Sequence, residues 1–512
     1  MIETTRRQFL QTSAAGAVVL ATPFGPVRAA MKGGVMRMGK AHGQTVDSLD
    51  PGTHENGFTI AMTHGYNGYM TEVGADGSLV GQLAESWEPS ADVATWTFRL
   101  RQGVVYHNGR EVTAQDVVAS INHHRGEDST SAAKPIVEPI ADIKADGKHT
   151  VVFTLGAGNA DFPFILSDYH LPILPSEDGT ADWQSGIGAG AYKIKSFDPG
   201  VRIDLVKHGD YWDSERGNFD EIQMITIVDP TARTNAIITG QVDAIDRVDL
   251  KTVHLLKRRA GLNVHSIAGT QHYTFPMRTN VAPFDDNNVR MAIKHAINRE
   301  EMVEKILQGF GVVGNDHPIG PGQRFFAKDL EQRVYDPDKA KHYLKQAGLD
   351  SLTVDLSVAD AAFAGAVDAG ALFAESAKAA GITLNLIREP NDGYWSNVWN
   401  TKPFCACYWG GRPVEDQMFS TAYAAGQPWN DTAWEHERFN MLLETARAEV
   451  DEAKRLEMYV EMQQIVRDEG GVIVPMFASY VFATSDKVAT PEQMGSNWDL
   501  DGERWMERWS FA

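Results

Sequence analysis

Short stretches of the chain alternate between hydrophobic and polar residues, which is the pattern of a half-buried β-strand. Residues 95–101 place Trp96, Phe98 and Leu100 on one face of such a strand. Similar stretches predict further strands at 150–155, 191–197, 202–207, 221–228 and 382–386.

Helices are predicted between these strands by apolar residues spaced three and four apart. Thr113 and Asp116 have the spacing of a capping box at a helix start, and Asn298 and Glu301 repeat it. Further helices are predicted from Asp336-Pro337 onward and over 433–449 and 451–468. Strands and helices mixed in this way predict an α/β architecture with two lobes rather than a helical bundle or a β-sandwich.

Length and charge limit the possible classes of protein. The chain has 512 residues, which is too long for one compact core and predicts two or three domains. Its formal net charge of -21 disfavours binding to nucleic acid, because that needs a basic surface.

The N-terminus has the pattern of an export signal. Arg6-Arg7 is followed by Phe9-Leu10 and by an apolar run over about 14–21, which predicts a twin-arginine signal peptide cleaved after Ala29. The apolar run is shorter than the ~20 residues that span a bilayer. We therefore expect a mature chain in the periplasm, with residues 1–29 removed.

Catalytic motifs are not found in the sequence. It contains no phosphate-binding loop, no Gly-x-Ser-x-Gly elbow and no zinc-binding His-Glu-x-x-His helix, since Asn440 stands where the second histidine is needed after His436. Residues 186–191 match a dinucleotide fingerprint only superficially, because no buried strand precedes them. We predict no enzyme activity, no cofactor and no metal site, with an exported enzyme as the alternative of a different class.

The only two cysteines are Cys405 and Cys407. A disulfide across so short a loop is strained, so we expect two buried free thiols.

Several blocks along the chain resemble one family, the extracytoplasmic solute-binding proteins of the peptide and nickel class, which include the oligopeptide- and dipeptide-binding proteins. The strongest resemblance is in Leu83–Glu88, Trp96–Val104 and His107–Val117. Smaller blocks follow in the family's order at 188–192, 210–212, 240–243, 283–290 and 335–340.

The resemblance implies a two-lobed periplasmic-binding-protein fold of type II, in its large form with an extra subdomain. Lobe one would comprise 30–73, 190–279 and 475–512, the extra subdomain 74–189, and lobe two 280–474. Two segments would cross between the lobes, near Tyr273–Asn280 and Val474–Phe482. The implied function is that of a monomeric receptor. It would capture a peptide or another polar organic solute between the lobes and deliver it to the membrane permease of an ABC importer, whose ATPase subunits are separate.

One position departs from the family pattern. In peptide-binding members, a tryptophan is followed three residues later by an aspartate that pairs with the peptide's amino group. Here Trp409 is followed by Arg412, whose guanidinium offers donors to a carboxylate or phosphate. This substitution predicts a solute with an acidic or strongly polar end. In the alternative, Arg412 pairs with Glu415 or Asp416 and only shapes the loop.

Aromatic residues gather in the sequence around Arg412, as expected for the wall of a binding cleft. Trp409 is the first candidate for a ligand contact, and Trp395 and Glu415 are nearby candidates. His272 and Tyr273 lie at a predicted crossing segment. Tyr66 is either a ligand contact or a core residue. The residues leave open a peptide, an opine-like conjugate, a sugar and, as the runner-up, a nickel chelate.

Overall fold

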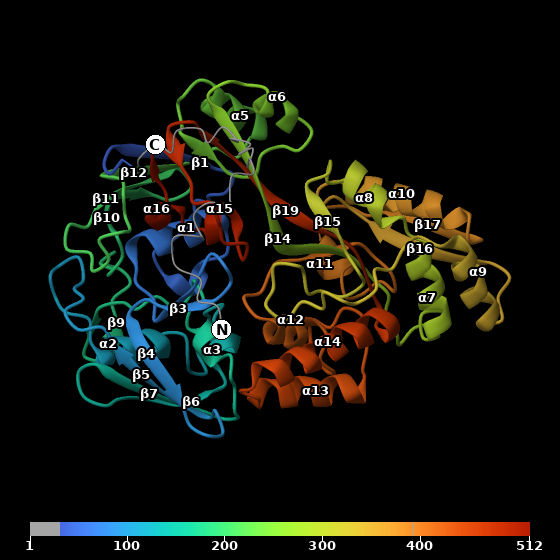
Figure 1. Cartoon of the computed structure of the whole chain (residues 1–512), viewed down its shortest axis with the longest axis horizontal. Helices are drawn as coiled ribbons and strands as arrows, with labels where there is room; N and C mark the ends of the chain where they lie inside the picture. The colour runs from blue at the N-terminus through green and yellow to red at the C-terminus, as the bar shows by residue number, and fades with distance from the viewer. Residues whose placement is uncertain (1–30, 392) are drawn as a thin grey trace, which may run out of the picture.

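The computed structural model describes residues 31–391 and 393–512. The predicted signal peptide, residues 1–29, lies outside them. The described chain forms two bodies side by side, joined by two long strands (Figure 1). Within the described residues no helix is both long and apolar enough to cross a membrane.

Lobe one is built on the first part of a nine-stranded mixed sheet with the order β10-β11-β12-β1-β13-β19-β14-β18, and β15 pairs with β19 beside this path. β1 runs parallel to both of its neighbours, whereas β10, β11 and β12 are antiparallel to one another. Tyr66, Tyr192 and Trp505 are buried together in its core. Its strands are β1 (Val35–Lys40), β10 (Tyr192–Asp198), β11 (Arg202–Lys207), β12 (Glu221–Thr226) and β13 (Ala244–Ile245), and its helices are α1 (Gly57–Tyr66), α5 (Pro230–Ile238), α6 (Val253–Lys257), α15 (Asp499–Gly502) and α16 (Trp505–Arg508).

Two strands cross from lobe one into lobe two. β14 (Leu262–Pro276) and β19 (Val472–Ser485) run antiparallel to each other, and their register is irregular between Ala268 and His272. In lobe one β19 pairs with β13, and in lobe two it pairs with β15 (Gly311–Val313) while β14 pairs with β18 (Cys407–Trp409). The predicted pair of crossing segments is therefore confirmed.

The extra subdomain has an antiparallel sheet of its own. Its order is β4 (Ala84–Pro89), β5 (Thr95–Leu100), β7 (Thr150–Leu155) and β6 (Ile140–Ala145). Its buried core draws on residues from Met70 to Ala189, among them Trp96 and Phe98, which the alternating pattern places on one face. The remaining elements are η1 (Pro51–Thr53), β2 (Thr71–Val73), β3 (Leu79–Gly81), α2 (Ala114–Asn122), α3 (Lys134–Val137), α4 (Phe162–Ile165), β8 (Ser176–Glu177) and β9 (Thr180–Ala181).

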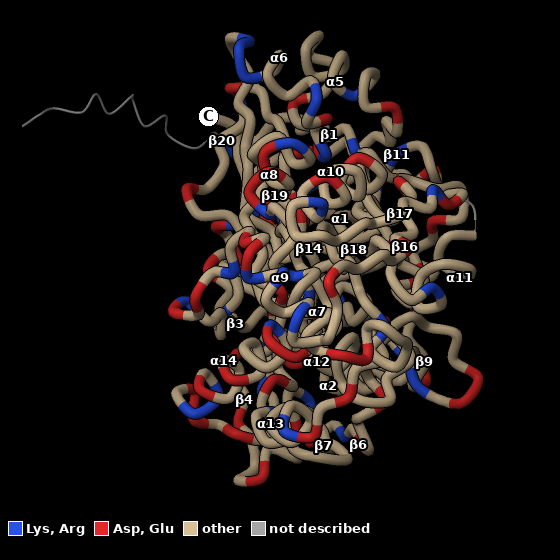
Figure 2. Tube along the Cα trace, turned by 90° about the vertical axis from the view of Figure 1, so that its right-hand side faces the viewer, with Lys and Arg blue, Asp and Glu red and all other residues tan. Residues whose placement is uncertain are grey.

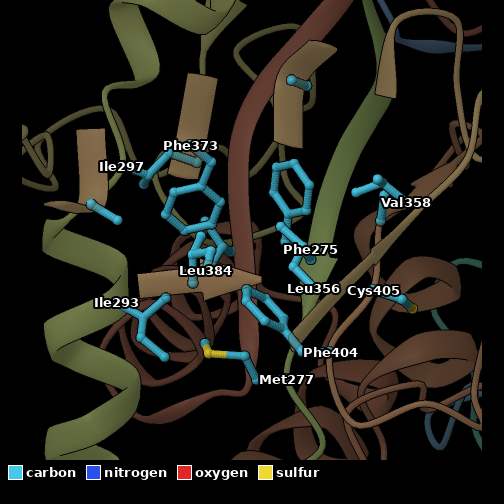
Figure 3. Close-up of a cluster of buried hydrophobic side chains, with 14 of the residues drawn as sticks. Phe275, Met277, Ile293, Ile297, Leu356, Val358, Phe373, Leu384, Phe404 and Cys405 are labelled. Carbon is cyan, nitrogen blue, oxygen red and sulfur yellow. The ribbon is translucent and has the colours of Figure 1, made fainter. Parts of the chain in front are cut away.

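Lobe two combines a parallel strand pair with helices. Its upper core packs the pair against α7 and α10, and Phe275, Phe373 and Phe404 meet there (Figure 3). A second core holds Trp409, Phe419 and Tyr459 among the lower helices. The elements of lobe two are α7 (Asn287–His295), α8 (Arg299–Lys305), α9 (Pro337–Gln346), β16 (Leu352–Val358), α10 (Ala366–Lys378), β17 (Ile382–Arg388), α11 (Tyr394–Asn397), α12 (Glu415–Ala422), α13 (Glu437–Ala448) and α14 (Glu452–Glu469). The strands β20 (Val488–Ala489) and β21 (Ser510–Phe511) pair with each other near the C-terminus and pack on the lobe-one core.

The helix starts predicted from capping residues are confirmed. Thr113 and Asp116 form a reciprocal capping box at α2, and the side chains of Asn298 and Asp336 cap α8 and α9. The helix predicted from 433 begins only at Glu437, because Ala433 has a φ of 49°, far from the φ of about −63° of a regular right-handed α-helix.

Both cysteines are free and buried, as predicted. Cys405 belongs to the upper core of lobe two (Figure 3) and Cys407 to the lower one. Figure 2 shows acidic and basic residues interspersed along the side of the molecule that lobe two forms.

Candidate functional site

A cavity lies between the lobes. Its free volume is about 30 Å³, enough for one or two water molecules. Thr270, on a crossing strand, lines it together with residues from both sides. The lobe-one side and the extra subdomain contribute Val73, Gly74, Gly77, Phe164, Ser496 and Asn497, and lobe two contributes Gly322, Gln323, Arg324, Arg412, Pro413, Val414 and Glu415.

Arg412 reaches this cavity from the loop that follows β18. Its Nη1 donates hydrogen bonds to the carbonyl oxygens of Gly410 and Gly411, at 3.4 Å and 3.1 Å. Burial lowers the pKa of its guanidinium, and the nearby Tyr169 and Asp168 act in the opposite direction. Arg412 is thus a half-buried cation that, among the described residues, forms no ion pair with a carboxylate within 4.0 Å.

The two carboxylates that the sequence offers to Arg412 have other partners. Asp416 pairs with Arg447 at 3.1 Å, and Glu415 accepts a hydrogen bond from the Phe325 amide at 2.7 Å. The alternative in which Arg412 pairs with Glu415 or Asp416 is therefore not found in the structure. Burial raises the pKa of Glu415 to about 7, so this carboxyl is partly protonated near neutral pH.

A glycine lets the Arg412 loop pack against the crossing strand. A Cβ atom at Gly411 would overlap the hydroxyl of Thr270, so only glycine fits under β14 at this point. The position of Arg412 is consequently set by a close approach of two chain segments that lie about 140 residues apart in the sequence.

The other candidates are distributed over the two faces of the β14–β18 pair. His272 lies opposite Trp409 in the register, and both are buried on the side of the lower core. Burial lowers the pKa of His272 to about 4, so its ring is neutral, and it packs against Phe477 with a centroid distance of 5.3 Å. Tyr273 points to the other face and stacks on Phe363 at 4.1 Å.

Trp395 and Tyr66 lie in contrasting environments. Trp395 is 41% exposed on α11. Tyr66 is buried in the lobe-one core, where its hydroxyl donates to the Leu49 carbonyl at 3.4 Å. Of the two alternatives for Tyr66, the structure therefore places it in the core.

The extra subdomain touches lobe two through the loop before α4. Asp161 and Arg455 form an ion pair in which each side chain is only 3% exposed. The Ala160 amide donates to the Arg447 carbonyl at 2.7 Å. Phe164 packs with Val73 and Val414 in a small apolar cluster. These contacts hold the two bodies together beside the cavity.

Sequence reasoning missed much of the cavity wall. Arg324, Asn497 and Phe164 line it, yet none of them belongs to a recognisable motif. They come from segments far apart in the chain, and only folding brings them together. Among the described residues, no cluster of three or more His, Cys, Asp or Glu side chains is arranged to hold a metal ion.

Two lobes joined by crossing strands, with a cavity between them, have the architecture of the solute receptors that work by hinge closure. Comparison with known proteins gives the family. Residues 78–431 match the model described as bacterial extracellular solute-binding proteins, family 5 Middle, and the chain belongs to this family. It is accordingly a substrate-binding protein of an ABC importer and not an enzyme.

A relative in sequence agrees with the family, and two solved structures agree in fold. The dipeptide-binding protein of Escherichia coli (strain K12) is 25% identical over 441 residues, which cover 77% of this chain and 80% of that one. The structure of HbpA2 from Haemophilus parasuis has a TM-score of 0.83 at 18% identity and covers 94% of this chain and 100% of that one. AgaA from A. tumefaciens R10, solved in complex with agropinic acid, has a TM-score of 0.75 at 22% identity and covers 94% and 99%. The predicted fold class is thereby confirmed, whereas the exact lobe boundaries stay a prediction.

Proposed function

We propose that the transported solute is a polar organic or peptide-like molecule whose acidic group is bound by Arg412 in the interlobe cavity. The observation that carries this proposal is the half-buried guanidinium of Arg412 at the cavity, which donates hydrogen bonds to two backbone carbonyls and forms no ion pair within 4.0 Å with a carboxylate of the described chain. A cation that is partly removed from water is stabilised by a counter-charge. A ligand carboxylate would supply the missing charge with forked hydrogen bonds.

The ligands bound in two structurally similar proteins agree with this range of solutes. Agropinic acid is an acid, and the peptide bound by the Helicobacter pylori protein DppA is a polar chain. Because the cavity admits only one or two waters in this structure, the lobes must separate to admit a solute and close again around it. The closed form would then deliver the solute from the periplasm to the permease.

Native mass spectrometry of the purified mature protein is the first test. We expect a co-purifying molecule with an acidic group, retained by wild type and by Arg438→Ala, and lost from Arg412→Ala. Arg438 is a suitable control because its ion pair with Glu461 is on the exposed surface of α13 and α14. Retention of the same molecule by Arg412→Ala contradicts the proposal. If no molecule co-purifies, a thermal-shift screen replaces the test, since a ligand at 100 times its Kd adds about 2.7 kcal/mol of stability.

We further propose that export uses the twin-arginine pathway. Arg6 and Arg7 precede the apolar run in the sequence, outside the residues that the structure describes. Replacing both with lysine is expected to leave the precursor in the cytoplasm, as judged by fractionation and immunoblotting. Export of the lysine variant at the normal rate contradicts this route.

A further inference from the structure

Five aromatic side chains wrap around the free edge of β18. We call them the aromatic rim: Trp395, Trp399, Tyr408, Trp409 and Trp429. Trp395 contacts Tyr408 with ring centroids 5.5 Å apart, and Trp399 contacts Trp429 at 6.2 Å. Trp399 also joins Trp395 to Trp409, so the rim is continuous.

Three rim side chains are open to solvent. The exposed fractions are 41% for Trp395, 40% for Tyr408 and 51% for Trp429. Large aromatic side chains usually bury most of their area, and a contiguous exposed apolar patch marks an interaction site. The rings meet edge to face, with interplanar angles of 72° for Trp395 and Tyr408 and 76° for Trp399 and Trp429. Ring faces therefore remain available for stacking.

A buried carboxylate fixes the rim in place. Asp431 is buried beneath it and accepts a hydrogen bond from Nε1 of Trp399 at 2.9 Å. Its side chain also interacts with Trp409. Tyr408 is held as well, because it lies directly opposite Tyr273 in the β14–β18 register. Pre-positioned rings lose little entropy when a ligand binds, which favours recognition.

The rim does not line the cavity itself, but it lies close in the chain to the proposed acid-binding residue Arg412. Tyr408 and Arg412 are four residues apart on β18 and its following loop, so their Cα atoms are at most about 14 Å apart. Trp409, between them, belongs to the rim. A solute held at Arg412 by its acidic group can therefore place a neighbouring group against the rim.

We propose that the aromatic rim is a ring-binding subsite, and that the transported solute is an acid that carries a ring. This inference rests on the proposed function, because it takes the acid to be held at Arg412. The ring is either aromatic or a pyranose, and both kinds of ring would stack on the exposed faces of Trp395, Tyr408 and Trp429. The occupant is part of the same small molecule and not a separate partner.

Two matched pairs of acids test the subsite with the mature protein. Hippurate and N-acetylglycine differ by an aromatic ring, and glucuronate and gluconate differ by a closed pyranose ring. Affinities are measured by calorimetry, and tryptophan fluorescence reports contact with the rim. We expect the ring-bearing member of at least one pair to bind roughly 10-fold more tightly than its ring-free counterpart, and the pair that discriminates identifies the kind of ring.

Variants separate this inference from the proposed function. Trp429→Ala and Tyr408→Ala should each weaken the ring-bearing acid by roughly 10-fold and leave the ring-free acid unchanged. Trp183→Ala, at a half-buried tryptophan of the extra subdomain, should change neither. Arg412→Ala should weaken both acids of the pair.

Each result tests either the acid site at Arg412 or the ring-binding subsite. If Arg412→Ala weakens binding but the rim variants bind like wild type, the subsite is wrong and the acid site stands. If the rim variants lose the ring-bearing acid while Arg412→Ala does not, the acid site is wrong. Equal binding within both pairs, or no binding and no change in fluorescence with any of the four acids, overturns the ring-binding subsite.

Discussion

Asp161 and Arg455 form a buried ion pair that joins the extra subdomain to lobe two. Asp161 lies in the loop before α4, and Arg455 lies on α14, where its Nε also donates to the Ala446 carbonyl at 3.1 Å. The pair is outside the cavity lining, so it stabilises the closed arrangement without contacting the solute.

Arg455→Ala is expected to favour separation of the lobes. It leaves the carboxylate of Asp161 buried and unpaired whenever the lobes are closed, which costs about 3–5 kcal/mol. Small-angle X-ray scattering should show a larger radius of gyration than for wild type. Arg438→Ala, which removes only an exposed ion pair worth about 0–1 kcal/mol, should scatter like wild type. Identical scattering by wild type and Arg455→Ala contradicts the role assigned to the pair.

Glu415 should make stability depend on pH. Burial, assisted by the nearby Asp161 and opposed by Arg324 and the Phe325 amide, raises its pKa from 4.5 to about 7. The folded protein favours the protonated form of this carboxyl. The resulting contribution to the free energy of unfolding, about 3 kcal/mol, is complete below pH 4.5 and is lost as the pH rises through 7. Glu415→Gln cannot titrate, and its amide oxygen can still accept from Phe325.

The measurement is urea unfolding of wild type and Glu415→Gln at pH 5 and pH 8. Other buried carboxyls titrate in both proteins, so the free energy of unfolding is compared between the two at each pH. We expect the variant to gain stability relative to wild type at pH 8. A difference between the two proteins that is the same at both pH values rules this role out.

Cys405 and Cys407 should be unreactive in the native protein. Both are buried and free, and burial raises the pKa of each thiol above its ordinary value. A thiol-specific reagent at pH 8 should therefore label neither cysteine in the folded protein and both in denaturant, because the thiolate is the reactive form. Rapid labelling without denaturant would show that one thiol is accessible.

The glycine-rich loop 186–191 should tolerate no side chain at Gly188. A Cβ atom there would overlap the carbonyl oxygen of Tyr66, a backbone atom that cannot move aside cheaply. We expect Gly188→Ala to lower the free energy of unfolding by about 2 kcal/mol or more. Gly209→Ala is the control, since its Cβ would meet no atom within 4 Å, and we expect a change within about 0.5 kcal/mol. Equal stability of the two variants in urea contradicts this packing role.

Local structure was predictable where neighbouring residues decide it. The capping box of Thr113 and Asp116 and the alternation of Trp96 and Phe98 act over three or four residues, so sequence alone located α2 and β5. The start of α13 was misplaced because the left-handed Ala433 belongs to a loop folded against the rest of lobe two. The family resemblance added the two crossing strands, which no local pattern contains.

The candidate site was predictable only in part. Arg412 became a candidate because it departs from a motif, and only the structure shows that it has no ion pair within 4.0 Å among the described residues. Tyr66 is an aromatic residue of the kind that lines binding clefts, yet the packing of lobe one buries it. Whether a side chain is buried depends on which other segments of the chain pack against it, and its residue type alone does not contain that information.

The sequence by itself determined the α/β class, the main helix starts, the free thiols and the kind of protein, because these follow from short-range patterns and motif blocks. Only the tertiary structure decided which side chains meet at the interlobe cavity. Asn497, Arg324 and Arg412 are separated by tens to hundreds of residues, and long-range packing of β14 and β19 sets their approach. The same packing pairs Asp161 with Arg455 and leaves three side chains of the aromatic rim exposed, since contact and solvent exposure are properties of the folded chain.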